Sequence, residues 1–257
     1  MSVYDTMASD FDRRRALPDG VPEAIRDTIL AAIGTARPAI LDLGAGAGRI
    51  GRSFVRAGDD YIGADLSFGM LLAFAGSVAA PRLVQADGAR LPFADATFDA
   101  VLLVQVLSGA HRWQHLLTDT MRVLRPGGAL IAGRVVAPDD GIDARMKARL
   151  ATILDDIDVH PYRDKPRDDA LSWLIRTMPE HTVRTAATWT AERTPAAFLE
   201  RHAGGARFSV LDAAVKQDAM RQLAVWATGQ FGSLDAAFAE NYSFELTIHR
   251  SQQGIPT

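Results

Sequence analysis

The chain has 257 residues, of which 48% are hydrophobic and 23% charged, close to the averages for globular proteins. Its 28 basic and 31 acidic residues give a formal net charge of −3, so no global positive field favours binding to nucleic acid or to an anionic membrane. Because cysteine is absent, disulfides, thiolate metal sites and cysteine nucleophiles are excluded. No apolar run approaches the roughly 18 residues of a spanning helix, and the first fifteen residues lack the apolar stretch of a secretory signal. We therefore predict a cytoplasmic protein.

Short apolar runs alternate with helix-like stretches between residues 39 and 135. This alternation is typical of βαβ units, which build a parallel sheet with helices on both faces. Later runs are continuously apolar, as expected for strands buried on both faces. The predicted strands are Ala39–Leu43, Asp60–Ala64, Arg82–Ala86, Phe98–Val104 and Ala129–Val135.

Helices in the same region are indicated by the residues that begin and end them. Pro22 stands in the first turn of a helix that ends at Gly34. Ser67 is the N-cap of another. A third covers His111–Leu124 and is followed by Arg125-Pro-Gly-Gly, which we expect to form a turn before the fifth strand.

Beyond residue 135 the alternation gives way to helical periodicity. Helices are predicted near 142–157, 170–177, 195–202 and 211–230, with alternating strands at 183–190 and 242–250. We therefore divide the chain into two parts. The predicted core comprises residues 1–136 with about 182–190 and 242–250, and a predicted helical cap that contains the substrate region comprises about 138–180 and 192–240.

A glycine-rich turn, Asp42-Leu-Gly-Ala-Gly-Ala-Gly-Arg-Ile-Gly51, follows the first strand. Glycine lets the chain turn sharply into a helix and lets a ligand approach the backbone, at the crevice where doubly wound sheets bind ligands. In one register Gly46-x-Gly48-x-x-Gly51 fits a dinucleotide motif, with Asp65 near the spacing of a ribose-binding acid. In the other, Asp42-x-Gly44-x-Gly46-x-Gly48 places an acid at the strand end. Both registers predict a cofactor site.

The second register accounts for more of the chain, because further segments occur with it in a fixed order. They are Ile40-Leu-Asp-Leu-Gly-Ala-Gly-Ala-Gly, Gly63-Ala-Asp-Leu-Ser-Phe-Gly-Met-Leu, Gln85-Ala-Asp-Gly-Ala-Arg-Leu-Pro-Phe, Phe98-Asp-Ala-Val and Arg122-Val-Leu-Arg-Pro-Gly-Gly. On these segments the chain resembles a class I S-adenosylmethionine-dependent methyltransferase of the type 11, small-molecule kind. The resemblance implies an α/β fold with a doubly wound, mainly parallel sheet of seven strands in the order 3-2-1-4-5-7-6, the last two partly antiparallel.

The resemblance also implies S-adenosyl-L-methionine as cofactor and a role for each matching residue. Gly44 and Gly46, with Ala45 between them, would leave room for the methionine part of the cofactor. Asp65 would accept hydrogen bonds from both ribose hydroxyls. The remaining cofactor-binding candidates are Leu66 and Met70 against the purine, Asp87 with Gly88 at the adenine amino group, Gln105 near the ammonium group, and Asp42, which we expect to hold the backbone amides of the turn.

Catalytic residues are less determined, because methyl transfer needs a base only when the acceptor is a hydroxyl or a protonated amine. His111, in the loop after the fourth strand, is the candidate base; a surface histidine at a helix start is the alternative. The family commonly has Leu-His after this strand, where Leu107-Ser108 stands here. The candidate lining residues of a pocket for an apolar or aromatic acceptor, each of which is alternatively a core residue, are Trp173, Tyr162, His160, Phe198 and Trp226.

We therefore predict an enzyme, a monomer or homodimer, that transfers a methyl group to oxygen, nitrogen or carbon of a small molecule, with no nucleic-acid or membrane partner. The histidines show no metal-ligand spacing, so no metal site is predicted. Two alternatives remain. One is a protein that binds the cofactor without methylating. The other is an NAD(P)-dependent oxidoreductase, which would leave Asp87 unexplained and lacks a Tyr-x-x-x-Lys pair.

Overall fold

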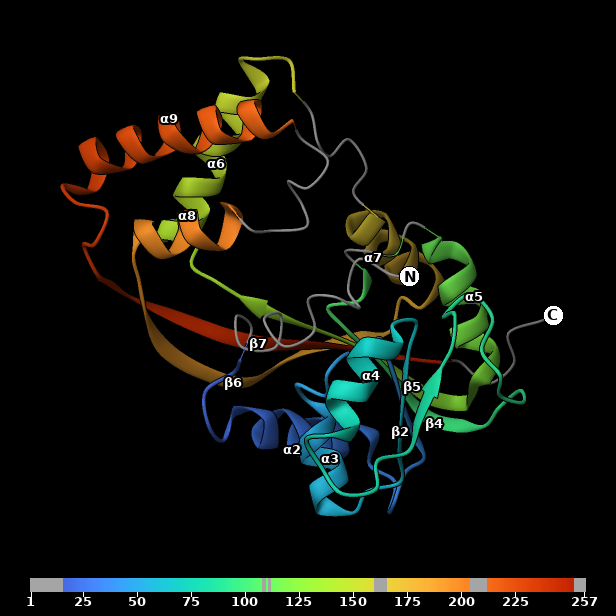
Figure 1. Ribbon diagram of the computed structural model, residues 1–257. Helices are drawn as coiled ribbons and strands as arrows, with labels where there is room; N and C mark the ends of the chain where they lie inside the picture. The colour runs from blue at the N-terminus through green and yellow to red at the C-terminus, as the bar shows by residue number, and fades with distance from the viewer. Residues whose placement is uncertain (1–15, 108–109, 111, 160–165, 204–211, 252–257) are drawn as a thin grey trace. The chain divides into compact units, whose positions relative to one another are not determined.

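The computed structural model of the chain describes residues 16–107, 110, 112–159, 166–203 and 212–251. Its centre is a seven-stranded sheet with the order β3-β2-β1-β4-β5-β7-β6, which confirms the predicted fold class and strand order (Figure 1). The strands are β1 (Ile40–Leu43), β2 (Tyr61–Asp65), β3 (Leu83–Gln85), β4 (Phe98–Val104), β5 (Leu124–Val136), β6 (His181–Arg193) and β7 (Phe238–Arg250).

The first five strands run parallel. β1 pairs with both β2 and β4, β2 with β3, and β4 with β5. Strands β6 and β7 run in opposite directions. The Thr190 hydroxyl of β6 donates to the Asn241 side chain of β7, and the Arg250 amide of β7 donates to the carbonyl oxygen of Glu180, just before β6. Residue numbers therefore rise along β7 as they fall along β6. The late strands are antiparallel, as predicted.

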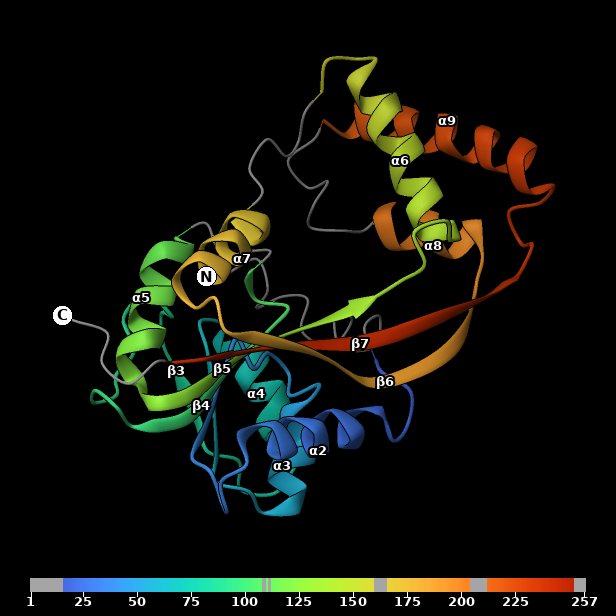
Figure 2. The ribbon, with the colours of Figure 1, turned by 180° about the vertical axis from the view of Figure 1, so that it is seen from behind.

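Five helices belong with the parallel strands: α2 (Val21–Ile33), α3 (Gly51–Ala57), α4 (Phe68–Ala75), α5 (Trp113–Val123) and α7 (Pro166–Thr177). α2 forms because Ile25 and Ile29 recur at helical spacing and are fully buried, and it ends where Gly34 adopts a left-handed conformation and its amide bonds Leu30. Figures 1 and 2 show α2 beside α3, and α5 beside α7.

The predicted turn at Arg125–Gly128 is wrong, because these residues lie inside β5. The pairing of β4 with β5 passes from Phe98 opposite Leu124 to Ala100 opposite Ala129. One residue of β4 thus faces four of β5, which makes a bulge in which Gly127 has a φ of 78°. Proline and glycine here interrupt the regular ladder without ending the strand.

The chain divides into two compact units. The first comprises residues 1–134, 165–187 and 244–257; the second comprises 135–164 and 188–243. The second contains α6 (Ile142–Asp155), α8 (Pro195–Ala203) and α9 (Ala213–Phe231), whose buried apolar residues form one cluster that includes Met146, Phe198 and Leu223. Helices were predicted near each of these segments.

The unit boundaries differ from the predicted division at α7, which we placed in the helical cap. Ala170, Leu174 and Met178 recur every four residues and are buried in the apolar cluster that contains Leu41 and Leu117. α7 therefore packs with the first unit. Sequence periodicity shows that a helix has an apolar stripe but does not say which cluster covers that stripe.

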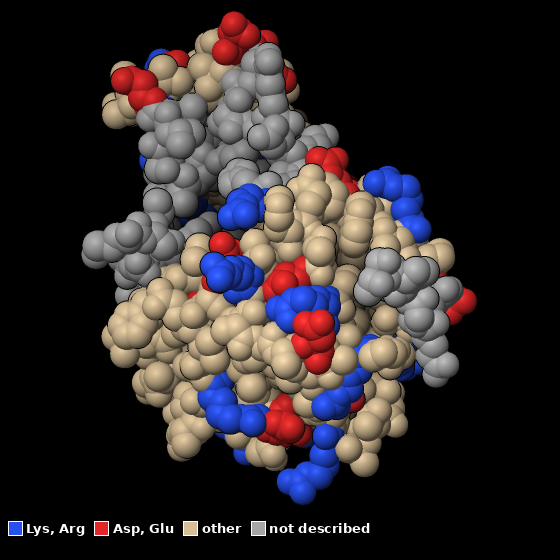
Figure 3. Space-filling model, turned by 90° about the vertical axis from the view of Figure 1, so that its right-hand side faces the viewer, with Lys and Arg blue, Asp and Glu red and all other residues tan. Residues whose placement is uncertain are grey.

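Among the described residues, no helix is both long enough and apolar enough to cross a membrane. Basic and acidic side chains are interspersed over the face shown in Figure 3, in keeping with the nearly balanced charge of the chain.

Candidate functional site

The glycine-rich turn joins β1 to α3 through residues in unusual backbone conformations. Gly44, Gly46 and Gly48 have φ angles of 78°, 55° and 84°, in the left-handed region that glycine adopts at little cost. The amides of Gly44 and Ala45 both donate to the carbonyl oxygen of Ala64, at 2.8 and 3.1 Å. The turn is thereby fixed to the carboxyl end of β2, the neighbouring strand.

The space beside each glycine separates those that pack the protein from those that leave an opening. A Cβ atom at Gly48 would lie 2.3 Å from the ring of Phe74, and one at Gly51 would lie 2.2 Å from the hydroxyl of Tyr61. At Gly46 the nearest atom is a backbone oxygen 4.0 Å away. Protein packing thus explains Gly48 and Gly51, two of the three glycines of the dinucleotide register, without a ligand.

Gly44 differs from the sequence expectation that it leaves room for the cofactor. A Cβ atom there would lie 2.7 Å from the side chain of Val106, which follows β4. Gly44 is therefore required by its φ angle and by Val106. Ala45 is also buried, so its side chain faces the protein. Of these three residues, Gly46 is the one beside open space.

Asp65 ends β2 and turns its carboxylate toward the glycine-rich turn. One oxygen, Oδ2, accepts from the Gly46 amide at 2.8 Å, and the other, Oδ1, accepts from the Ser67 amide at 2.8 Å. Ser67 in turn caps α4 by accepting from the Met70 amide. A carboxylate oxygen has two lone pairs, so these bonds fix the group and leave acceptor capacity for a ligand. This geometry fits the role expected for Asp65.

Asp42 contradicts the expectation that it holds the amides of the turn. Its side chain is buried and its Oδ2 accepts from the Tyr61 hydroxyl at 2.7 Å, whereas Oδ1 has no hydrogen-bond partner among the described residues. Burial raises the pKa of Asp42 to about 6; the Tyr61 hydrogen bond opposes the increase and the charge of Asp65 adds to it. Asp65 accepts a hydrogen bond from the turn because β2 ends beside the turn. The Asp42 carboxylate instead faces the buried Tyr61 side chain.

The two apolar candidates occupy different environments. Leu66, directly after Asp65, is 63% exposed, but Met70 is 3% exposed. On the same helix as Met70, Phe68 and Leu72 are also about 60% exposed. The Leu66 side chain is therefore available to pack against a ligand. The Met70 side chain is instead buried and packs α4 onto the protein.

Asp87 and Gly88 follow β3. Asp87 is about half exposed; its Oδ1 accepts from the Ala89 amide at 2.9 Å, and its Oδ2 lies 3.8 Å from Arg112. A Cβ atom at Gly88 would lie 3.1 Å from Leu116 and 3.3 Å from Leu43. Gly88 therefore packs closely beside the end of β1 and leaves the Asp87 carboxylate at the carboxyl edge of the sheet.

Gln105 directly follows β4 and has a φ of 57°, a strained angle for a residue with a side chain. Its amide donates to Gly133, and its Oε1 accepts from Arg49 Nη1 at 2.7 Å. Sequence reasoning missed Arg49, although it stands directly after the third glycine of the turn. Its basic character at this position was the available signal.

The catalytic candidate His111 and the neighbouring Ser108 lie outside the described residues. Of the candidate lining residues, His160 and Tyr162 also lie outside the described residues. The other three pack against protein: Trp173 lies edge-on to Trp113, with ring centroids 6.3 Å apart, Trp226 lies edge-on to Phe231, with ring centroids 5.7 Å apart, and Phe198 is fully buried in the second unit. No group of three or more possible metal ligands occurs among the residues whose placement is known.

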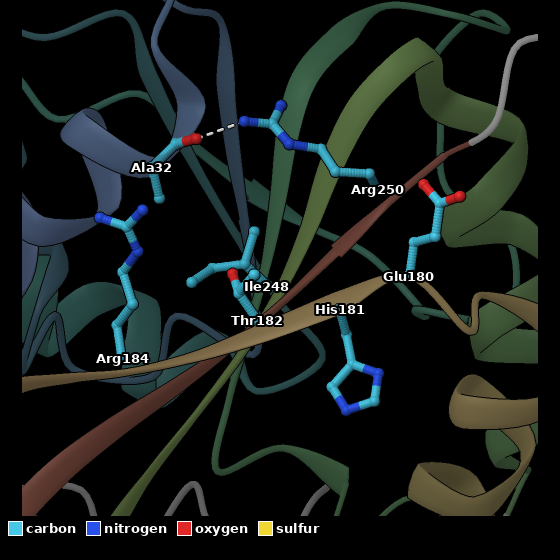
Figure 4. Close-up of a pocket in the computed structure, with 7 residues that line it drawn as sticks. All are labelled: Ala32, Glu180, His181, Thr182, Arg184, Ile248 and Arg250. Carbon is cyan, nitrogen blue, oxygen red and sulfur yellow. Dashed lines mark hydrogen bonds between the residues drawn. The ribbon is translucent and has the colours of Figure 1, made fainter.

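One cavity, of about 470 Å³, lies in the first unit away from these residues (Figure 4). Arg250 there donates to the carbonyl oxygen of Ala32 at the end of α2, and the His181 ring points away from the two arginine side chains. The cavity shares no residue with the predicted cofactor site. It is lined by Ala32, Glu180, His181, Thr182, Arg184, Ile248 and Arg250.

Comparisons with known proteins agree with the sequence resemblance. Residues 41–132 match the family described as a methyltransferase domain. A demethylmenaquinone methyltransferase of Thermobifida fusca is 35% identical over 137 residues, 51% of this chain and 58% of the relative. A malonyl-[acyl-carrier protein] O-methyltransferase of Pseudescherichia vulneris is 38% identical over 105 residues, 40% of this chain and 42% of that protein. The chain spans less than two thirds of the length of these relatives.

Solved structures share the fold. The YcgJ protein of Bacillus subtilis matches with a TM-score of 0.55 at 17% identity, and the match covers 90% of this chain and 99% of the YcgJ chain. Phosphoethanolamine N-methyltransferase 2 of Haemonchus contortus, solved with S-adenosylhomocysteine, has a TM-score of 0.51 at 16% identity, covering 97% of this chain and 58% of its own.

These comparisons confirm the predicted resemblance: residues 41–132, in the first unit, match a methyltransferase-domain family, and the strand order is the one that the resemblance implied. The family implies S-adenosylmethionine as cofactor, as predicted. The match ends at residue 132, before the first segment of the second unit.

Proposed function

We propose that the protein is an S-adenosylmethionine-dependent methyltransferase that methylates oxygen, nitrogen or carbon of a small molecule. The observation that carries this proposal is the fixed Asp65 carboxylate beside the open face of Gly46. A carboxylate held by two amides is prepared to accept hydrogen bonds from a pair of vicinal hydroxyls, such as those of a ribose.

The residues present fit the adenosyl part of this cofactor. Asp65 would hold the ribose, the exposed Leu66 would pack against the adenine, and Asp87 would accept from its amino group. The strained Gln105 fits the same site, because energetically costly backbone conformations concentrate where a ligand is bound. When bound, the cofactor supplies an electrophilic methyl group, and the protein's task is to orient the acceptor and exclude water.

The names of the relatives do not identify the acceptor of this protein. Their names specify demethylmenaquinone in one case and a malonyl group on a carrier protein in the other. The shared segment is therefore compatible with unlike acceptors. We propose that the segments outside the match select the acceptor, and that His111 is a candidate base. A cytoplasmic location and a monomeric or dimeric state stay predictions from the sequence.

Ligand binding tests the proposal directly. We expect S-adenosylmethionine and S-adenosylhomocysteine to raise the melting temperature and NAD(P) to leave it unchanged, since a ligand at 100 times its Kd adds about 2.7 kcal/mol. Asp65→Ala should weaken binding of both adenosyl ligands at least about 100-fold by removing charge-assisted hydrogen bonds. Stabilisation by NAD(P) alone would overturn the proposal.

A matched control is available next to the same strand. Asp60 stands just before β2, at the opposite end from Asp65, and its side chain pairs with Arg82. Asp60→Asn should retain full affinity for both adenosyl ligands. Turnover with candidate acceptors then separates a methyltransferase from a protein that only binds the cofactor.

A further inference from the structure

We propose that the cavity lined by Arg184 and Arg250 binds the phosphate or carboxylate group of a small organic anion. Its volume of about 470 Å³ is within the range of roughly 300–1,000 Å³ that is typical of small-molecule sites. All of its lining residues belong to the first unit, and none of them is a candidate for the cofactor site. The inference is therefore independent of the proposed function.

The cavity lies at the edge of the sheet where the parallel strands begin. Ala32 lines it near the end of α2, the helix that precedes β1, and Arg250 is the last residue of β7. The next amide, that of Ser251, donates to Gly128 near the start of β5. Asp65 stands instead at the carboxyl end of a parallel strand. The cavity and the candidate cofactor site are therefore at opposite edges of the sheet.

Two antiparallel strands direct polar side chains to the cavity. Thr182 and Arg184 are two residues apart on β6, and Ile248 and Arg250 are two apart on β7, so each pair lies on one face of the sheet. Figure 4 shows both guanidinium groups on the side of the cavity near Ala32, which they approach from different directions. The lining thus combines two cationic groups with a hydroxyl and apolar surface.

Arg250 is held in place by the end of α2. Its Nη2 donates to the carbonyl oxygens of Ala32 and, at 3.3 Å, of Ile33. The Nε and Nη1 groups have no hydrogen-bond partner among the described residues, so they keep three of the five N–H donors of a guanidinium. Arg250 is therefore both anchored and able to bind a ligand.

Arg184 adds a second positive charge without a partner. Within the part of the chain that the structure describes, no hydrogen bond or ion pair engages its guanidinium. Glu180 also lines the cavity, but no described ion pair joins it to either arginine. Two like charges beside one cavity repel each other, and an oxyanion between them would replace that repulsion with attraction. The planar fork of a guanidinium matches the oxygen atoms of phosphate and carboxylate.

Calorimetry with three matched ligands tests the proposal. Glycerol 3-phosphate, glycerate and glycerol carry a phosphate, a carboxylate and no charge on a similar carbon chain. At constant ionic strength in chloride, we expect at least one of the two anions to bind with a Kd below about 1 mM, and glycerol not to bind. The tighter anion identifies the group that the cavity prefers. Failure of both anions, or equal binding of glycerol, would overturn the proposal.

Variants of Arg184 locate the bound anion. Arg184→Gln should weaken it about 10- to 100-fold, the value of a charge-assisted hydrogen bond, and should fold normally because the side chain is exposed. Arg184→Lys keeps the charge without the planar fork and should have an intermediate affinity. Arg176→Gln, exposed in the last turn of α7 and outside the cavity, is the matched control and should bind like the wild type. Equal effects of Arg184→Gln and Arg176→Gln would contradict the assignment.

Glu180→Gln should act in the opposite direction. Removal of the negative charge from the lining should strengthen anion binding about threefold, and weaker binding would contradict the assignment.

A last measurement separates this cavity from the candidate cofactor site. Saturating S-adenosylhomocysteine should change the affinity for the anion less than about twofold, because the two sites are at opposite edges of the sheet. Competition between the two ligands would show that the anion occupies the cofactor site and would overturn the inference. If S-adenosylhomocysteine does not bind at all, the proposed function fails, whereas anion binding that depends on Arg184 still supports the inference.

Discussion

Asp42 and Asp65 lie on neighbouring strands at the same edge of the sheet, yet the structure uses their carboxylates differently. Asp42 faces Tyr61 beneath the glycine-rich turn and is 3% exposed. Asp65 accepts hydrogen bonds from the backbone amides of Gly46 and Ser67 and is partly exposed. The comparison shows that the region around Asp42 and Tyr61 is packed, whereas the region at Gly46 and Asp65 is open, as the proposed cofactor site requires.

Glycine substitutions should separate the two regions most strongly. In Gly51→Ala the new methyl group would meet Tyr61 and Phe74, so we expect a loss of about 3 kcal/mol in the free energy of unfolding, measured by urea denaturation. Gly46→Ala meets no such obstacle and should cost about 1 kcal/mol, from its φ angle alone, while it weakens S-adenosylhomocysteine binding.

Gly58→Ala is the control for the conformational cost, because Gly58 also has a positive φ and nothing within 4 Å of a Cβ atom. It should resemble Gly46→Ala in stability and the wild type in ligand binding. Equal stability of Gly51→Ala and Gly46→Ala would contradict the division into a packed and an open region.

The free energy of unfolding should depend on pH through Asp42, the carboxylate of the packed region. Burial raises the pKa of Asp42 from 3.8 to about 6, so the native state holds this proton more tightly than the unfolded chain does. Stability from this group is therefore greatest below about pH 4, falls as the pH rises toward 6, and is constant above that. The expected decrease is about 3 kcal/mol.

Asp42→Asn isolates this contribution from that of the other carboxylates. The difference in unfolding free energy between the variant and the wild type should change between pH 4 and 6, measured in urea at each pH. A difference independent of pH would show that Asp42 ionises normally and that the region beneath the turn is more hydrated than its burial indicates.

Removing the Tyr61 hydroxyl should have a smaller effect. Tyr61→Phe deprives a buried carboxylate of its hydrogen-bond donor, so we expect a loss of about 2 kcal/mol at pH 7. The double variant with Asp42→Asn should lose less than the sum of the single variants, because the two groups interact. Additive losses, measured by a double-mutant cycle, would mean that the hydrogen bond contributes no stability.

The sequence by itself determined that the core is a parallel sheet with helices between its strands, because apolar runs separated by helical stretches specify that arrangement. The order of the strands came from the resemblance to a methyltransferase family, and the structure has the same order. In that order, acids such as Asp65 and Asp87 at strand ends are brought to one edge, where the candidate site was predicted. The location of α7 could not be predicted, because its apolar stripe fits any cluster of suitable shape.

Only the tertiary structure decided which residues are packed and which lie beside open space. Gly46 and Gly51 are alike in sequence, but Tyr61 and Phe74 fill the space beside one and leave the other open. The hydrogen bond between Arg49 and Gln105 likewise joins residues 56 positions apart. The physical reason is that burial and partner choice depend on residues distant in the chain, which a local pattern does not contain.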